Sequence, residues 1–225
     1  MPMPHLPDIN WPTRIDQARI IQQQLRDQVI RRNELPEPIG LVAGVDVGFE
    51  DSGKTTRAAI AVLNFPALTL HEQTIARVPT RFPYVPGYLS FRELPGVMQA
   101  LQQLHAMPDL LLCDGQGIAH PRRFGLACHL GVLSGLPTIG VAKSRLIGHY
   151  QEPAGDKGAW EPLWGDTEEE EMIGAVLRTR DHVRPLFVSI GHRVDLPTAI
   201  NFVLRCTTRF RLPETTRWAH RLASG

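Results

Sequence analysis

The sequence predicts an α/β protein in which a mixed β-sheet carries helices on both faces. Three consecutive runs of β-branched and apolar residues, separated by short turns, are followed by alternating helical and strand-like patterns. Hydrophobic residues make up 43% of the 225 residues, which is enough for a substantial core. We expect one domain, because neither an internal repeat nor a linker divides the chain.

The first helix is predicted shortly after the proline-rich amino-terminal residues. Thr13 and Asp16 have the spacing of a capping box with Asp in place of Glu, and Asn33 and two prolines end the pattern. We expect this helix to be amphipathic and to cover the sheet. Its apolar residues follow one another at steps of three or four: Ala18, Ile21, Leu25 and Val29.

Three strands are predicted next, at residues 41–49, 56–65 and 68–78. The first two are joined by the turn residues 51–54, and the second pair by a short turn at Pro66. Connections this short join antiparallel neighbours, so the three strands should form a meander.

Helices and strands then alternate. A helix opens at Ser90 or Leu94 and runs through Leu104. We place the core at about residues 13–208 and expect a polar, basic tail at 209–225. Pattern alone leaves several α/β folds open. The remaining predicted elements are strands at 110–114, 138–142, 173–178 and 186–190 and helices at 124–134 and 196–206.

Composition narrows the functional classes. The net charge of +1 does not indicate a nucleic-acid partner, but residues 152–171 are mostly acidic and arginine dominates after them, which suits one basic face. We expect the acidic run 168–171 to be a solvated loop. No secretory leader and no apolar run long enough for a bilayer is evident, so we expect a cytoplasmic protein. Zinc or disulfide chemistry is disfavoured because the three cysteines are far apart: Cys113, Cys128 and Cys206.

Two aspartates are candidates for a metal site. Asp46 lies between Val45 and Val47 inside a strand, where an ionised carboxylate must be paired, hydrogen-bonded or metal-bound if it points inward. Strand alternation could instead point it outward. Asp114 ends a buried strand, where α/β sheets place ligand-binding groups, although an Asp-Gly turn explains it too. On neighbouring strands, the two would form an oxygen-rich site suited to Mg²⁺ or Mn²⁺.

Other candidates have structural alternatives. Glu93 could join the aspartates, but Ser90 and Glu93 also have capping-box spacing. Prolines on both sides of Tyr84 stiffen a loop that could open a base stack, or Tyr84 could pack inward. Lys143 and His192 each end a strand, where they could bind phosphate or metal or be solvated tips.

Taken together, these segments resemble endonuclease V. The resemblance runs in order from about residue 40 to 195, and it is more specific than any single glycine pattern because several multi-residue motifs contribute to it. The matching stretches are AGVDVGF (43–49), PYVPGYLSFRE (83–93), DGQGIAHPR (114–122), GVAK (140–143) and GHR (191–193).

The resemblance implies a ribonuclease H-like fold with a catalytic centre dependent on Mg²⁺, for which Mn²⁺ can substitute. Asp46, Glu93 and Asp114 would hold the metal with His192 close by, and Lys143 and His120 would lie beside the scissile phosphate or the product. The strand-separating wedge would fall on Pro83, Tyr84, Val85 and Pro86. The lesion pocket and its nucleic-acid contacts would fall on Gly87, Leu89, Gly115, Gln116, Gly117, Ile118, His120 and Arg122.

The implied activity is DNA repair by an endonuclease that recognises deaminated purines, above all inosine. Such an enzyme nicks one nucleotide beyond the lesion on its 3′ side and leaves 3′-hydroxyl and 5′-phosphate ends. The implied partner is DNA that contains deaminated bases, and we expect a monomer without an obligate protein partner. Two alternatives remain: an inosine-specific endoribonuclease, and a protein that binds modified bases without cutting.

Overall fold

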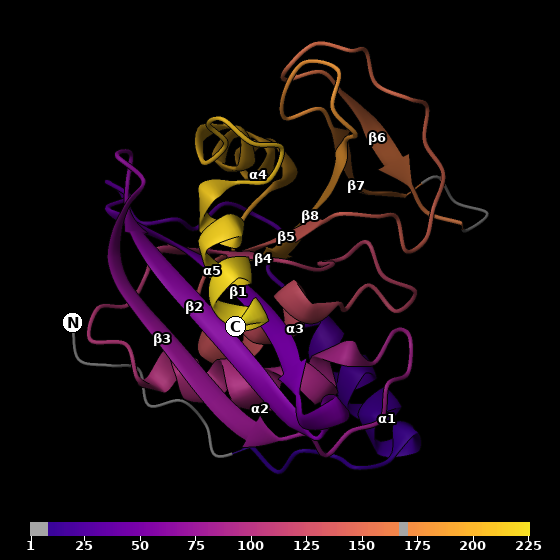
Figure 1. Ribbon diagram of the computed structural model, residues 1–225. Coiled ribbons are helices and arrows are strands. Elements are labelled where there is room, and N and C mark those ends of the chain that lie inside the picture. The colour runs from indigo at the N-terminus through magenta and orange to yellow at the C-terminus, as the bar shows by residue number, and fades with distance from the viewer. Residues whose placement is uncertain (1–8, 167–170) are drawn as a thin grey trace.

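The computed structural model describes residues 9–166 and 171–225, and these form a mixed sheet with helices on both faces (Figure 1). Eight strands are arranged in the order β3-β2-β1-β4-β5-β8-β7-β6. This confirms the predicted fold class. The predicted acidic loop at 168–171 lies outside the described residues except for Glu171, which pairs with Arg31 and Arg123.

The predicted meander is confirmed within one residue at each strand boundary. It consists of β1 (Leu41–Glu50), β2 (Thr55–Asn64) and β3 (Thr69–Pro79), paired antiparallel, with the short 3₁₀ turn η1 (Asp51–Gly53) between β1 and β2. Near-continuous apolar residues in β2 fit its place between two strands with both faces covered, because seven consecutive residues from Ala58 are almost all buried.

Parallel strands continue the sheet from the other side of β1. The short, fully buried strands β4 (Leu110–Cys113) and β5 (Thr138–Ala142) run parallel to β1, and β8 (Leu186–His192) returns antiparallel to β5. The carboxyl ends of β1, β4 and β5 therefore point in the same direction, which positions the residues that follow β4 and β5 near one another. Strands β7 (Met172–Leu177) and β6 (Trp160–Trp164) complete the far edge.

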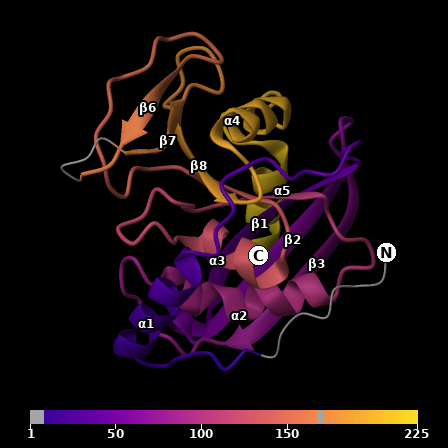
Figure 2. The same ribbon diagram turned by 180° about the vertical axis from the view of Figure 1, so that it is seen from behind.

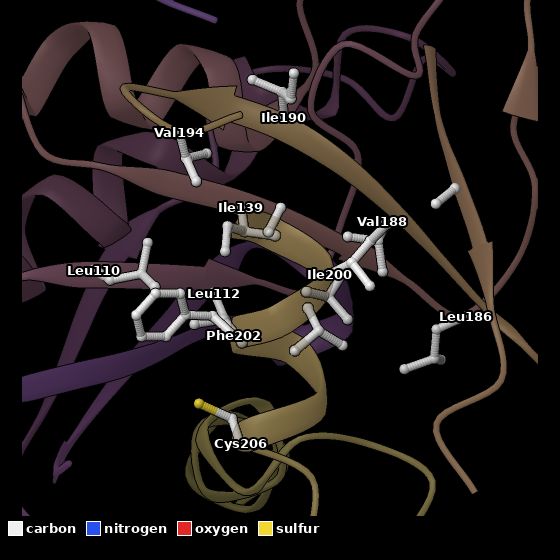
Figure 3. Close-up of a cluster of buried hydrophobic side chains, with 14 of the residues drawn as sticks. Leu110, Leu112, Ile139, Leu186, Val188, Ile190, Val194, Ile200, Phe202 and Cys206 are labelled. Atoms are coloured by element: carbon white, nitrogen blue, oxygen red, sulfur yellow. The ribbon is translucent and has the colours of Figure 1, made fainter. Parts of the chain in front are cut away.

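Each face of the sheet has its own helical cover. Helices α2 (Leu89–Gln102) and α3 (Leu126–Ser134) lie behind the sheet in Figure 1 and in front of it in Figure 2. The opposite face is covered by α4 (Leu196–Arg205) and α5 (Glu214–Ser224). Figure 3 shows Ile200 and Phe202 of α4 among apolar side chains of β4, β5 and β8, which form one buried cluster.

The first helix differs from its prediction. Helix α1 (Ile15–Arg26) is shorter than the apolar pattern suggested, and its N-cap is Arg14, without a side-chain capping hydrogen bond. Asp16 forms an exposed ion pair with Arg14 in place of the predicted capping box with Thr13. The helix packs mainly on α3 and so covers another helix more than the sheet.

Two elements were not predicted at all. Strand β6 lies in the stretch that was expected to be irregular, and α5 lies in the stretch that was expected to be a polar tail. Four α5 side chains are nonetheless buried: Thr215, Thr216, Ala219 and Ala223. Small and hydroxyl-bearing side chains give a weak apolar signal, which explains the error. Among the described residues, every helix falls short of the length and apolar character that a bilayer crossing requires.

Candidate metal and nucleic-acid site

Asp46 and Asp114 lie side by side on neighbouring parallel strands, as predicted. Val45 is paired with Cys113 in the β1–β4 register, and the Asp114 amide donates to the Val45 carbonyl at 3.0 Å. Partial burial and the nearby charge of Asp114 raise the pKa of Asp46, against the hydrogen bond that it accepts from His220. Two ionised carboxylates this close together repel each other, and a positive charge between or beside them offsets the repulsion.

His220, on the unpredicted helix α5, completes a three-residue cluster with the two aspartates. Its Nδ1 lies 2.7 Å from Oδ2 of Asp46. One ligand atom from each of Asp46, Asp114 and His220 lies within 4.8 Å of the other two. Two carboxylates and one imidazole can together ligate a divalent cation, and the oxygen majority favours Mg²⁺ or Mn²⁺.

Two glycines of β1 explain how α5 comes so close to Asp46. Gly44, Asp46 and Gly48 share one face of the strand because side chains alternate. A methyl group at Gly44 would lie 1.9 Å from the backbone oxygen of Thr215, and one at Gly48 would lie 2.2 Å from that of Ala223. The helix backbone therefore rests directly on the strand and holds His220 above Asp46.

Lys143 also reaches this cluster, as predicted. It follows β5, and its ammonium forms an ion pair with Oδ2 of Asp114. Arg211 fixes the backbone at this point, because its Nη2 donates to the carbonyls of Lys143 (3.0 Å) and Pro185 (2.9 Å). Lys143 thus supplies a half-exposed positive charge at the edge of the carboxylate pair.

Glu93 lies near the aspartates but outside the three-residue cluster. Burial, together with the charges of Asp46 and Asp114, raises the pKa of Glu93 to about 8. The capping-box alternative is wrong, because the N-cap of α2 is Tyr88 and Ser90 lies inside the helix, where its hydroxyl contacts His129. That Glu93 is a metal ligand stays a prediction. Its position near the other two carboxylates is seen in the structure.

His192 is not where the sequence analysis expected it. It ends β8, which runs antiparallel to β5, so it is paired with Thr138 at the beginning of β5, while Lys143 follows the opposite end. It is 4% exposed, and its Nδ1 accepts a hydrogen bond from the Ile30 amide at 3.2 Å. Burial lowers its pKa to about 4, so it is a neutral structural histidine. His220 occupies the place predicted for His192.

A cavity of about 360 Å³ opens beside the cluster and joins most of the predicted recognition residues. Tyr84, which is 69% exposed, lines the cavity together with Glu93, Asp114 and Lys143. The inward-packed alternative for Tyr84 is therefore wrong. The other predicted residues in the lining are Pro86, Gly87, Leu89, Gly115, Gln116 and His120.

Five other predicted recognition residues do not line this cavity: Pro83, Val85, Gly117, Ile118 and Arg122. The backbone amides of Gly117 and Ile118 are used within the protein. The Gly117 amide donates to Ser189 Oγ, and the Ile118 amide donates to the Ile190 carbonyl, both at 2.8 Å. These two amides are therefore not available to bind a base or a phosphate, and the recognition role of Gly117 and Ile118 stays a prediction.

His120 is fully engaged by neighbouring groups. Its Nδ1 accepts from the Arg122 amide at 3.2 Å, and its Nε2 lies 3.0 Å from the Gly87 carbonyl, to which it must donate. Burial and the adjacent Arg122 lower its pKa to about 4. A neutral imidazole with both nitrogens occupied does not transfer protons, so His120 shapes the cavity wall.

Comparison with known proteins agrees with this geometry. The profile of the endonuclease V family matches residues 23–221. An endonuclease V from Nostoc punctiforme is 57% identical over 217 residues, which cover 96% of this chain and 97% of that protein.

Solved structures give the same result. The crystal structure of endonuclease V from Streptomyces avermitilis superposes with a TM-score of 0.90 at 46% identity, covering 96% of this chain and 93% of that one. Endonuclease V from Ciona intestinalis, crystallised with a 24mer DNA containing an inosine followed by a ribo-adenosine, gives 0.82 at 32% identity, covering 93% and 95%. With its profile, sequence and fold all in agreement over nearly its whole length, this chain belongs to the endonuclease V family.

Proposed function

We propose that this protein is a metal-dependent endonuclease that recognises deaminated purines, above all inosine, in DNA. It nicks the strand one nucleotide beyond the lesion on the 3′ side and leaves 3′-hydroxyl and 5′-phosphate ends. One observation carries the proposal: a cluster of Asp46, Asp114 and His220 lies beside a base-sized cavity bordered by an exposed tyrosine. The inosine-containing DNA bound by the Ciona intestinalis relative supports the same substrate.

Asp46, Asp114 and His220 fit a divalent cation, and we propose Mg²⁺, with Mn²⁺ as a substitute. The donor set is rich in oxygen, and burial, together with repulsion from Asp114, raises the pKa of Asp46. When bound, such an ion activates water and stabilises the leaving oxygen in phosphodiester cleavage. Lys143 adds positive charge beside Asp114, where it opposes the negative charge that builds up on the phosphate.

The cavity next to this cluster is proposed to hold the lesion after it leaves the base stack. Tyr84 on its proline-flanked loop fills the gap in the duplex or stacks on a neighbouring base. Hypoxanthine presents an O6 acceptor and an N1–H donor, whereas adenine presents an amino group and an N1 acceptor. Backbone amides at fixed positions along the wall, such as those of Gly87 and Gly115, distinguish these two patterns.

A second candidate substrate is inosine-containing RNA. The Ciona intestinalis complex holds DNA in which a ribonucleotide follows the inosine, so a relative accommodates a 2′-hydroxyl at that position. Incubation of matched DNA and RNA strands, with inosine or adenosine at one position, ranks the two substrates. We expect cleavage of the inosine strands only, with Mg²⁺ or Mn²⁺ and not with chelator.

The carboxylates provide the decisive variants. Asp46→Ala and Asp114→Ala should each abolish nicking while binding of the inosine strand largely persists, because both remove metal ligands and only Asp114 forms part of the cavity wall. Asp109→Ala, at the opposite end of β4, is the matched control for stability, since Asp109 binds the amides of Gly40 and Leu41. Metal-dependent nicking retained in both Asp46→Ala and Asp114→Ala contradicts the assignment.

A further inference from the structure

Gln22 is a buried polar side chain on α1, where Ala18 is the other buried residue. It is 1% exposed, whereas its neighbours Gln23 and Gln24 on α1 are exposed. Its Nε2 donates to the Gly87 carbonyl at 3.0 Å and lies 3.4 Å from the Phe124 carbonyl. Its Oε1 accepts from Arg122 Nε at 2.5 Å. A buried amide with both ends satisfied fixes the groups around it, because leaving any of them unpaired away from water is costly.

The carbonyl of Gly87 is the meeting point of this network. Besides Gln22, it receives Arg122 Nη2 at 2.5 Å and His120 Nε2 at 3.0 Å. Gly87 has φ +80°, and a methyl group there would lie 2.9 Å from Arg122 Nη2, so the tight approach requires glycine. Three donors from two other segments therefore converge on one carbonyl at the end of the Tyr84 loop.

Tyr88 ties the same loop to α1 a second time. The Arg122 guanidinium lies 4.1 Å from the centroid of the Tyr88 ring, and Arg19 Nε lies 3.2 Å from the Tyr88 hydroxyl. Tyr88 is 5% exposed, so this contact is largely removed from water. Helix α1 thus holds the loop before α2 against the loop after β4.

We propose that Gln22, Arg122 and the Gly87 carbonyl form a clamp that sets the spacing between the two walls of the lesion cavity, and that Gln22 is thereby a positioning residue for inosine selectivity. The inference rests on the proposed function. Gly87 and His120 line the cavity, whereas Gln22 does not. Gln22 touches neither base nor metal and acts through the backbone of Gly87.

The physical reason lies in recognition by fixed backbone groups. Such groups distinguish hypoxanthine from adenine only if donor and acceptor remain within a few tenths of an ångström of their positions, and a misplacement of about 1 Å can cost on the order of 100-fold in rate. The metal cluster lies on β1, β4 and α5, none of which Gln22 contacts through its hydrogen bonds. Loosening the clamp should therefore impair base selection and spare metal binding.

The test compares Gln22→Met with Gln24→Met, the same substitution at an exposed position of the same helix. For Gln22→Met we expect the selectivity ratio, kcat/KM for the inosine strand divided by kcat/KM for the adenosine strand, to fall at least tenfold. We expect the Mn²⁺ concentration for half-maximal activity to stay within twofold. Gln24→Met should match the wild type in both. A selectivity ratio unchanged in Gln22→Met, or a loss matched by a shift in Mn²⁺ dependence, overturns the clamp.

Two further measurements keep the result decisive. Arg122→Lys retains the charge but loses the forked contact to Gln22 and Gly87, so it should reproduce the loss of selectivity if Gln22→Met fails to fold. Amide hydrogen exchange of residues 83–88 should accelerate in Gln22→Met and not in Gln24→Met. Unchanged amide exchange in Gln22→Met refutes the clamp, whether or not the wild type cuts inosine strands. A wild type that leaves inosine strands uncut refutes the proposed function alone.

Discussion

His220 is the residue whose removal separates metal binding from folding most cleanly. Its ring is about half exposed and contacts Asp46, so His220→Ala creates no buried cavity. We expect Mn²⁺ affinity to fall about 10- to 100-fold with little change in melting temperature. Titration with Mn²⁺ followed by electron paramagnetic resonance measures it. His71→Ala, an exposed histidine of β3, is the control, and equal affinities in both variants refute the role of His220.

Tyr84 carries the second residue-scale prediction. An aromatic ring that is 69% exposed at the edge of the cavity contributes little to folding and is free to stack on a base. Tyr84→Ala should weaken binding of an inosine-containing strand by about 1–3 kcal/mol. Fluorescence anisotropy with Ca²⁺ in place of Mg²⁺ gives the affinity. Trp160→Ala, an exposed aromatic on the edge strand β6, should leave it unchanged, and an unchanged affinity for Tyr84→Ala excludes the stacking role.

Which site residues could be predicted depends on how local their signals are. Asp46 interrupts an apolar strand and Asp114 ends one, so each is visible within a few residues of sequence. His220 gives no such signal, because only the packing of α5 on β1 brings it to Asp46 across 174 residues. His192 has a strand-end position that looked suitable, but the antiparallel direction of β8 takes it to the other end of β5.

At the scale of elements, the contact between α5 and β1 sets the position of His220. Gly48→Ala forces a methyl group against the Ala223 backbone, so we expect a loss of about 1–3 kcal/mol in the free energy of unfolding and weaker Mn²⁺ binding. Gly40→Ala is the control, since a methyl group there would meet only Asp109 Oδ2, at 3.8 Å. Urea denaturation measures the free energy of unfolding of both variants, and Mn²⁺ titration measures their affinity for the metal. Wild-type values for Gly48→Ala contradict this account of α5.

Strands with long apolar runs were predicted well, whereas α5, whose packed face is made of small side chains, was missed. The apolar runs of β1 and β2 are long and outweigh the turn-forming residues within them, so the predicted bounds of both strands are nearly correct. In α5 the packed face consists of two threonines and two alanines, whose small side chains give a weak apolar signal. Had small residues been counted as core positions, Thr216, Ala219 and Ala223 would have indicated a helical face.

For the molecule as a whole, three buried neutral histidines predict sensitivity to acid. Burial lowers the pKa of His120 to about 4, of His129 to about 3 and of His192 to about 4, all from an ordinary value of 6.5. Between pH 6.5 and about 4 the unfolded chain binds protons at these residues and the folded chain does not, so the three histidines lower stability as pH falls through this window. Each histidine contributes about 1.4 kcal/mol per pH unit below 6.5. The raised pKa of Glu93 acts in the opposite direction, because the folded chain binds a proton there that the unfolded chain does not.

Urea denaturation of the metal-free protein at pH 7.5 and pH 5.5 measures this loss. His129→Gln should reduce the difference between the two pH values, because His129 is fully buried among aromatic rings. Exposed His105 is paired with Glu72, so exposed His71 is the better control, and His71→Gln should leave the pH difference intact. A pH difference in His129→Gln equal to that of the wild type contradicts the prediction.

The global strand order could be predicted only in part. Short connections indicated the meander, because they permit few geometries. The neighbours of β8 depend on tertiary packing: β8 pairs with β5, which precedes it by more than forty residues, and β6 reaches the sheet only through β7. Long irregular connections leave such pairings open in the sequence.

The central claim is that Asp46, Asp114 and His220 hold one divalent ion, and an anomalous difference map from a crystal soaked in Mn²⁺ tests it most directly. The account predicts a peak among these three side chains, within coordination distance of at least one oxygen of each aspartate, and its loss in Asp46→Ala. A well-ordered cluster with no peak at saturating Mn²⁺, or a peak bound elsewhere, would contradict it.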